Sequence, residues 1–176
     1  LDKSGAEQRI ATDFVFPVLT TKAELGEGSS YNNQTLVWDS MAPKSYHHDY
    51  PAADIHVSEG TKVSAAKGGQ VVMVRNTVQC DKQNFPLIVI RGVDGYYYLY
   101  SHLKPNSISL ASGDLVETGG VLAEVGSSAC AQNTAPHLHF DVSRFKNAAR
   151  GGFWGQVTLI DPQPALIKAY QKLPEK

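Results

Sequence analysis

The sequence predicts a mainly β domain, an antiparallel β-sheet or sandwich with a short C-terminal helix. Three observations predict it: runs of β-branched or alternating residues are common, turns rich in Gly, Asn, Asp and Pro separate them, and helical periodicity is scarce. With 176 residues, the chain has the size of one ordinary domain and can bury a self-sufficient core. We expect a single domain over 1–176, with a core at about 13–162, an N-terminal extension at 1–12 and a C-terminal helix and tail at 163–176.

Five runs carry the strand signal, because β-branched or alternating apolar residues fill them and turn residues bound them. In chain order they are 69–74, 86–91, 95–100, 121–125 and 137–143. The Asp94-Gly95 pair between the second and third runs is a strong β-hairpin signal. Two Gly-x-x-Val phrases, at 60–63 and 113–116, each place a turn before a further short strand. Biotinyl and lipoyl carriers share this phrase but need an exposed lysine at a hairpin tip, and none is evident here.

Helical spacing is clear only near the C-terminal end. Leu166, Ile167 and Tyr170 follow Asp161-Pro162 at helical intervals, which predicts a helix over 163–173. A short helix within 1–12 is a second expectation. Residues 20–44 are polar and without a clear period, which is typical of a long loop that forms the wall of a binding cleft.

Charge and composition exclude several function classes. Sixteen Lys and Arg residues against 17 Asp and Glu give a net charge of −1, so we expect no nucleic-acid partner. The longest apolar runs fall far short of the roughly 20 residues that cross a bilayer. Cys80 and Cys130 both stand in polar, loop-like segments, whereas buried free thiols favour apolar neighbours. A single Cys80–Cys130 disulfide is therefore favoured over two free thiols, and it implies an oxidising compartment.

The histidines are the most informative residues. His137 and His139 alternate with Leu138 in a predicted strand, so both imidazoles project from one face, about 6 to 7 Å apart. One imidazole can then ligate a metal while the other acts beside it, although two ordinary polar residues on a solvent-exposed face are the alternative.

Two further segments contain histidine. His47 and His48 precede Asp54 by a few residues, and two imidazoles with one carboxylate form a catalytic zinc set that leaves a position for water. His102 stands where a strong strand signal ends in a loop. Neither segment indicates a metal site by itself. Together with the His137/His139 strand, the two segments make a catalytic metal site a stronger prediction.

In this order, the residues resemble the lysostaphin/LytM-type zinc peptidases, which cut peptide cross-links of bacterial peptidoglycan. Six ordered elements carry the resemblance, which covers roughly 13–162 and implies a LytM-type fold. They are His48 to Asp54, GTKVSA at 60–65, GQV at 69–71, YSHL at 100–103, GDLV at 113–116 and HLHF at 137–140.

The resemblance also implies a site with about one Zn²⁺ per chain. The implied metal ligands are His48, Asp54 and His139, and the implied catalytic residues are His102 and His137. The commonest family spacing, His-x(3)-Asp, would place the first ligand at Tyr50, which is no plausible replacement. The Pro51-Ala52 turn is therefore interpreted as an insertion that moves the ligand to His48, with His47 as the alternative.

Two neighbours of this set share its strand faces. Asp141 follows His139 on the same face and is a candidate acceptor for the second N–H of a ligating imidazole. His56 follows Asp54 in the same way, and we expect an ordinary polar role for it.

The implied function is a zinc-dependent endopeptidase that hydrolyses peptide cross-links of peptidoglycan. The chain contains no HExxH element that would supply a glutamate base, so histidine, with its pKa near 6.5, is left for proton transfer. We expect an exported protein, periplasmic or secreted, whose signal or anchor lies outside the printed chain.

An inactive module of the same family, which binds and activates another cell-wall hydrolase as its protein partner, is the alternative. Such modules usually lack a metal or catalytic position, whereas all five positions are filled here.

Overall fold

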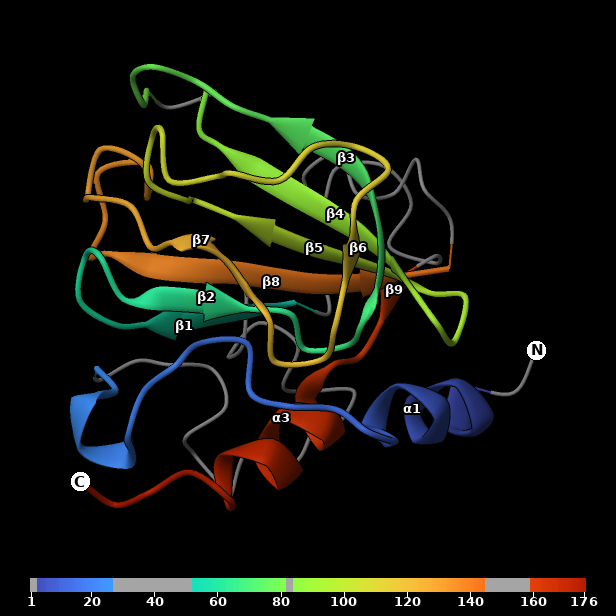
Figure 1. Ribbon diagram of the computed structural model, residues 1–176. Coiled ribbons are helices and arrows are strands. Elements are labelled where there is room, and N and C mark those ends of the chain that lie inside the picture. Colours follow the sequence, from blue (N-terminus) through green and yellow to red (C-terminus); the bar gives the residue numbers. More distant parts are fainter. Residues whose placement is uncertain (1–2, 27–51, 82–83, 145–158) are drawn as a thin grey trace.

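An antiparallel seven-stranded sheet dominates the computed structural model, which describes residues 3–26, 52–81, 84–144 and 159–176 (Figure 1). Its strands are β1 (Ala53–His56), β3 (Gly69–Arg75), β4 (Leu87–Gly92), β5 (Tyr97–Ser101), β6 (Leu115–Val116), β8 (His137–Ser143) and β9 (Leu159–Ile160). Their order is β1-β8-β5-β4-β3-β6, and β9 pairs with β8. The mainly β, antiparallel fold is confirmed, with the His-x-His strand β8 between β1 and β5.

The hairpin predicted at Asp94-Gly95 joins β4 to β5. Gly95 has a φ of +87°, and its amide donates a hydrogen bond to the Gly92 carbonyl at 2.8 Å. An L-residue with a Cβ is disfavoured at this φ, which explains the glycine.

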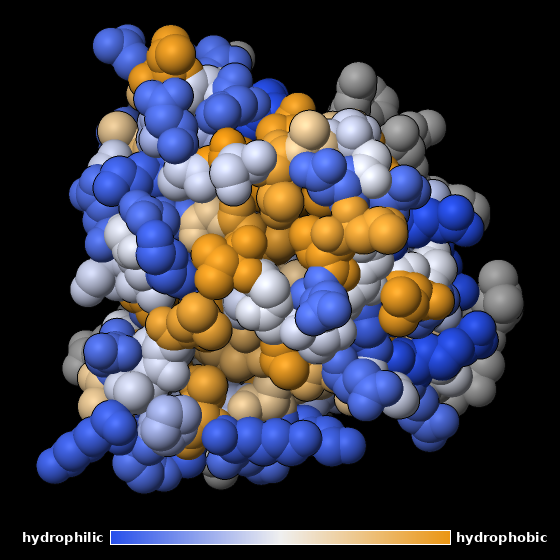
Figure 2. Space-filling model, viewed as in Figure 1, coloured by the Kyte–Doolittle hydropathy of each residue, from blue (hydrophilic) through white to orange (hydrophobic). Residues whose placement is uncertain are grey.

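A smaller layer covers one face of the main sheet. It contains the paired strands β2 (Lys62–Ser64) and β7 (Val121–Glu124), which lie in front of the main sheet in Figure 1. Residues 15–19 run beside β2, where Val15 N donates to Ala66 O at 3.0 Å and Leu19 N donates to Lys62 O at 2.9 Å. The molecular surface seen from this side carries a hydrophobic area (Figure 2). Leu115 of β6 and Val121 of β7 are exposed apolar side chains.

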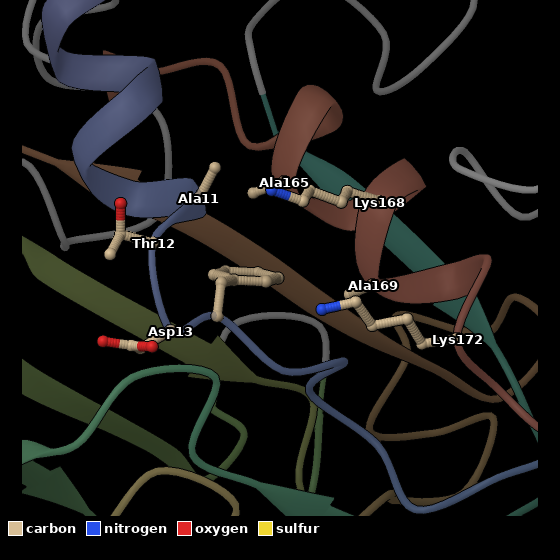
Figure 3. Close-up of a pocket in the computed structure, with 8 residues that line it drawn as sticks. Ala11, Thr12, Asp13, Ala165, Lys168, Ala169 and Lys172 are labelled. Atoms are coloured by element: carbon tan, nitrogen blue, oxygen red, sulfur yellow. The ribbon is translucent and has the colours of Figure 1, made fainter.

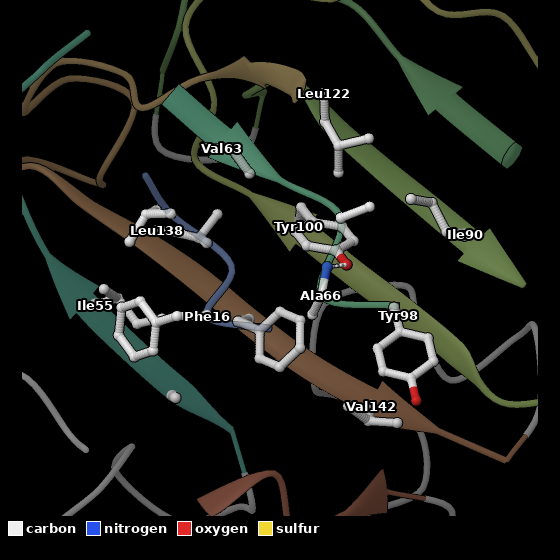
Figure 4. Packing of buried hydrophobic residues seen from close by; sticks show 14 of the residues in the cluster. Phe16, Ile55, Val63, Ala66, Ile90, Tyr98, Tyr100, Leu122, Leu138 and Val142 are labelled. Carbon is white, nitrogen blue, oxygen red and sulfur yellow. Dashed lines mark hydrogen bonds between the residues drawn. The ribbon is translucent and has the colours of Figure 1, made fainter. Parts of the chain in front are cut away.

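The core fills the space between these layers, because the alternation of each main-sheet strand turns one set of apolar residues toward it. Figure 4 shows main-sheet residues Ile55, Ile90, Tyr98, Tyr100, Leu138 and Val142 with Val63 and Leu122 of the smaller layer. The Tyr100 hydroxyl accepts a hydrogen bond from Ala66 N at 2.9 Å, which ties the two layers together.

Two helices, α1 (Lys3–Ala11) and α3 (Gln163–Tyr170), pack against each other at one end of the sheets (Figure 1). Ala6 and Ile10 of α1 and Leu166 of α3 are buried in the main core. The short C-terminal helix is confirmed, but it ends at Tyr170 rather than at residue 173, since Leu173 precedes Pro174 and that position disfavours helical backbone. None of the helices in the described ranges is long and apolar enough to span a membrane.

The long loop expected at 20–44 is described only up to residue 26, where Lys22–Glu24 form the short 3-10 helix η1. Residues 27–44 lie outside the described part of the chain.

Candidate active site

Strands β1 and β8 bring the predicted Asp and His side chains together. In the antiparallel register, Asp54 lies opposite His139 and His56 lies opposite His137. These residues alternate with core residues, so their side chains project from the sheet face that points away from the main core. The expectation that His137 and His139 share one face is confirmed by their common contact with Asp54.

His139 lies between two carboxylates. Its Nδ1 is 3.2 Å from Asp54 Oδ1, and its Nε2 is 3.1 Å from Asp141 Oδ2. Burial by itself lowers the pKa of His139, but the hydrogen bonds and charges of Asp141 and Asp54 outweigh burial and raise the pKa to about 10. The two carboxylates therefore favour a positive charge at this point, either a proton or a cation.

The contact of His139 with Asp141 was anticipated from the shared strand face. Asp141 is fully buried, and a carboxylate can only accept, so His139 Nε2–H donates to it. This leaves the Nδ1 atom directed toward Asp54.

His137 is held through its Nδ1 atom, whereas Asp141 holds His139 through Nε2. Its Nδ1 is 2.8 Å from the Ala135 carbonyl, which can only accept, so Nδ1 carries the proton. In the neutral ring Nε2 then holds a lone pair, and this atom lies 3.6 Å from Asp54 Oδ1. That tautomer has a proton acceptor directed at the carboxylate shared with His139.

His102 follows β5 and completes the cluster. Its ring packs edge-on against His137, with centroids 4.8 Å apart, and lies 5.9 Å from the ring of His139. Burial, followed by the charges of His139 and His137, lowers the pKa of His102 to about 3. The imidazole is therefore neutral at physiological pH.

Two contacts at this cluster were not predicted from the sequence. Phe85 packs its ring 4.4 Å from that of His102, and the Ala135 carbonyl orients His137. Both residues lie in connections between strands, and no periodic pattern in the sequence marks them.

His56 is closer to the cluster than an ordinary polar residue. Its ring lies 5.1 Å from that of His137, and its pKa is lowered first by burial and then by His137, while Asp54 opposes the shift. The sequence did contain the signal, since His56 follows Asp54 with the period of a strand.

The expected ligand His48 and its alternative His47 lie outside the described residues. Within the described ranges, no group of three or more His, Cys, Asp or Glu residues forms a metal-binding cluster. Asp54 and His139 are the two predicted ligands that the structure places together.

The predicted disulfide is confirmed. Cys80 and Cys130 are bonded, with Cα atoms 4.8 Å apart. The bond joins the connection between β3 and β4 to the turn that precedes β8.

A cavity of about 310 Å³ lies elsewhere, between the C-terminal end of α1 and the helix α3 (Figure 3). It is lined by Ala11, Thr12, Asp13, Phe14, Ala165, Lys168, Ala169 and Lys172. None of the clustered histidines lines it, so geometry and chemistry place the candidate site at the sheet face and not in this cavity.

Comparisons with known proteins show the family and the fold of the chain. The model of peptidase family M23 matches residues 48–151. The antimicrobial peptidase lysostaphin from Staphylococcus simulans is 24% identical, with a TM-score of 0.53 over 69% of this chain and 44% of that chain. A putative glycyl-glycine endopeptidase lytM from Ruminococcus gnavus is 20% identical, with a TM-score of 0.60 over 95% of this chain and 64% of that chain.

The catalytic domain of the prophage-encoded M23 protein EnpA from Enterococcus faecalis is 18% identical, with a TM-score of 0.54 over 84% of this chain and 94% of that chain. The chain thus spans less than half the length of lysostaphin and nearly all of the EnpA domain. No curated protein sequence matches the chain.

Proposed function

Because the chain belongs to peptidase family M23, we propose that it is a zinc-dependent endopeptidase that hydrolyses peptide cross-links of bacterial peptidoglycan. The observation that carries the proposal is the convergence of Asp54, His102, His137 and His139 at one sheet face. Metal-assisted amide hydrolysis requires metal ligands and groups that transfer protons. The carboxylate of Asp54 and the imidazole of His139 can ligate a metal, and two further imidazoles can transfer protons or donate hydrogen bonds.

The residues present fit a zinc ion. Two ligands of one tetrahedral zinc, each at about 2.0 to 2.1 Å, lie about 3.3 Å from each other, and Asp54 Oδ1 and His139 Nδ1 are 3.2 Å apart. Asp141 holds the opposite ring nitrogen of His139, as carboxylates commonly do for ligating histidines. His48 is proposed as the third ligand, with His47 as the alternative.

When bound, zinc supplies a Lewis acid that polarises the scissile carbonyl and lowers the pKa of water. His137 accepts a proton at Nε2 and later delivers it to the leaving amine, because Ala135 keeps the proton of the neutral ring on Nδ1. The neutral imidazole of His102 donates a hydrogen bond to the carbonyl oxygen as negative charge develops there.

We propose that the protein acts outside the cytoplasm, in the periplasm or in the secreted fraction. The Cys80–Cys130 disulfide supports this compartment, because such bonds persist where the environment is oxidising.

Digestion of purified cross-linked peptidoglycan tests the proposal. The zinc-loaded chain should release new amino groups from the peptide cross-links and leave the glycan strands uncut. A chelator should abolish the release, and added zinc should restore it. Substrates with D-amino-acid cross-links and with glycine bridges belong in the same assay, with His137→Ala as the matched inactive control.

A chain that cleaves none of these substrates when loaded with zinc, yet stimulates a partner hydrolase, would be the activating module instead. That outcome would remove the catalytic roles of His102 and His137.

A further inference from the structure

His102 has an unfavourable backbone conformation. Its φ is +62°, in the left-handed region that disfavours residues with a Cβ. Such a conformation persists only where the surrounding structure determines it strongly, and this occurs often at functional sites.

Two connections contact His102 and the residue after it. The β3–β4 connection contributes Phe85, whose ring lies 4.4 Å from the imidazole, and Pro86, whose carbonyl accepts a hydrogen bond from Leu103 N at 3.2 Å. The segment after β7 contributes Gly126, whose amide donates to the His102 carbonyl at 2.9 Å.

The Cys80–Cys130 disulfide joins these two connections beside His102. Cys80 Sγ lies 4.0 Å from the Leu103 carbonyl oxygen, and the backbone of Cys130 lies near the imidazole, where it partly offsets the lowering of the His102 pKa. No hydrogen bond of normal geometry reaches the buried Nδ1 of His102 within the described residues. The contacts with Phe85 and with the backbone of Cys130 therefore orient the ring, and both depend on how closely the two connections approach.

Gly126 shows how tight this approach is. A Cβ at this position would lie 2.5 Å from Cys130 Cβ and 2.8 Å from the carbonyl oxygens of both His102 and Leu103. Real Cβ atoms do not approach that closely, so only glycine lets the disulfide lie against the backbone that carries His102.

From these contacts, and on the premise that the proposed peptidase function holds, we propose that the Cys80–Cys130 disulfide is a positioning element for His102. It clamps the β3–β4 connection and the turn before β8 around residue 102 and so keeps the imidazole directed at His137 and His139. Breaking it lets the connections separate, and turnover falls while substrate binding and the Asp54–His139 pair remain. Peptidase activity then depends on whether Cys80 and Cys130 are oxidised to the disulfide.

A water-soluble phosphine is the suitable reductant, because dithiols also bind zinc. Its phosphorus attacks the sulfur of Cys80, which is more exposed than Cys130; the S–S bond breaks, and Cys130 leaves as a thiolate that takes up a proton. Water then converts the phosphorus adduct into phosphine oxide and releases the Cys80 thiol. The phosphine loses two electrons, and the disulfide gains them.

The test compares the oxidised chain, the phosphine-reduced chain and the Cys80→Ser/Cys130→Ser double variant. For each, kcat and KM on a cross-linked peptide, zinc content and the histidine ring-proton NMR signals are measured. We expect kcat to fall at least about tenfold, KM to change less than about threefold and zinc to stay bound. The His102 ring signals, shifted by Phe85 in the oxidised chain, should move toward free-histidine positions, and reoxidation should restore kcat and these signals.

Leu166→Ala is the control for lost stability, since Leu166 is fully buried in α3 among the core residues near α1. This variant should lower Tm as the double variant does, yet keep kcat. An unchanged kcat after reduction, loss of zinc together with kcat, or an equal loss of kcat in Leu166→Ala would each overturn the proposal.

The NMR signals separate this proposal from the peptidase assignment. If the oxidised chain cleaves no peptide, the peptidase function fails, and the His102 signals alone decide the positioning role. Signals that move on reduction support that role, and signals that stay in place overturn it.

Discussion

His137 and His139 are supported through opposite ring nitrogens. His139 donates from Nε2 to Asp141, whereas His137 donates from Nδ1 to the Ala135 carbonyl. Each ring therefore directs its remaining nitrogen at the same Asp54 oxygen, at 3.2 Å and 3.6 Å. One strand thus presents the proposed metal ligand, His139, and the proposed proton acceptor, His137, on one face, and a different partner holds each ring.

Asp141→Asn tests this dependence at the level of one side chain. The variant keeps the shape of the carboxylate and removes its charge, so zinc affinity should fall about 10-fold to 100-fold. Competition with a fluorescent zinc chelator measures the affinity. Asp161→Asn, which removes a buried carboxylate at the start of α3, should leave zinc affinity unchanged. If Asp141→Asn binds zinc as tightly as the native chain, Asp141 does not support the metal ligand.

Individual elements were predicted well wherever a strand carries its own alternation. Strand β8 matches the predicted run 137–143 at both ends, and its alternation was enough to place both imidazoles on one face. The pairing of Asp54 with His139 could not be predicted this way, because register between strands far apart in sequence is set by the whole sheet. Phe85 and Gly126 act from connections, whose conformation leaves no periodic trace in the sequence.

The start of α3 carries a pH-dependent contribution to stability. Asp161 Oδ1 accepts a hydrogen bond from Gln163 N at 2.9 Å, and burial, with a smaller effect of Glu7, raises the pKa of Asp161 to about 7. An unfolded aspartate has a pKa of about 3.9, so the folded chain binds more protons between about pH 4 and pH 7. The free energy of unfolding should therefore decrease as pH rises through this window, by up to about 4 kcal/mol from this group.

Asp161→Asn should remove that dependence. Near pH 4 the variant and the native chain should have similar stability, and near pH 8 the variant should be the more stable of the two. Urea denaturation at both pH values measures the difference. An equal difference at the two pH values would show that Asp161 is not the titrating group.

For the whole molecule, the disulfide links two connections that are distant in sequence. The sequence separation of Cys80 and Cys130 is 50 residues, and in the chain-entropy model a loop of that size stabilises the fold by about 4 kcal/mol. The Cys80→Ser/Cys130→Ser variant should lose stability of that order in urea denaturation at fixed pH. A loss below about 1 kcal/mol would mean that the reduced, unfolded chain is already constrained or that the bond strains the fold.

Zinc content of matched variants tests the central claim, that Asp54 and His139 hold the metal on which hydrolysis depends. The native chain should retain about one zinc per chain after mild purification, His139→Ala should retain almost none, and His102→Ala should keep the metal while losing turnover. Elemental analysis of the three proteins, alongside release of amino groups from cross-linked peptidoglycan, gives the result directly. Full zinc retention by His139→Ala would contradict the account.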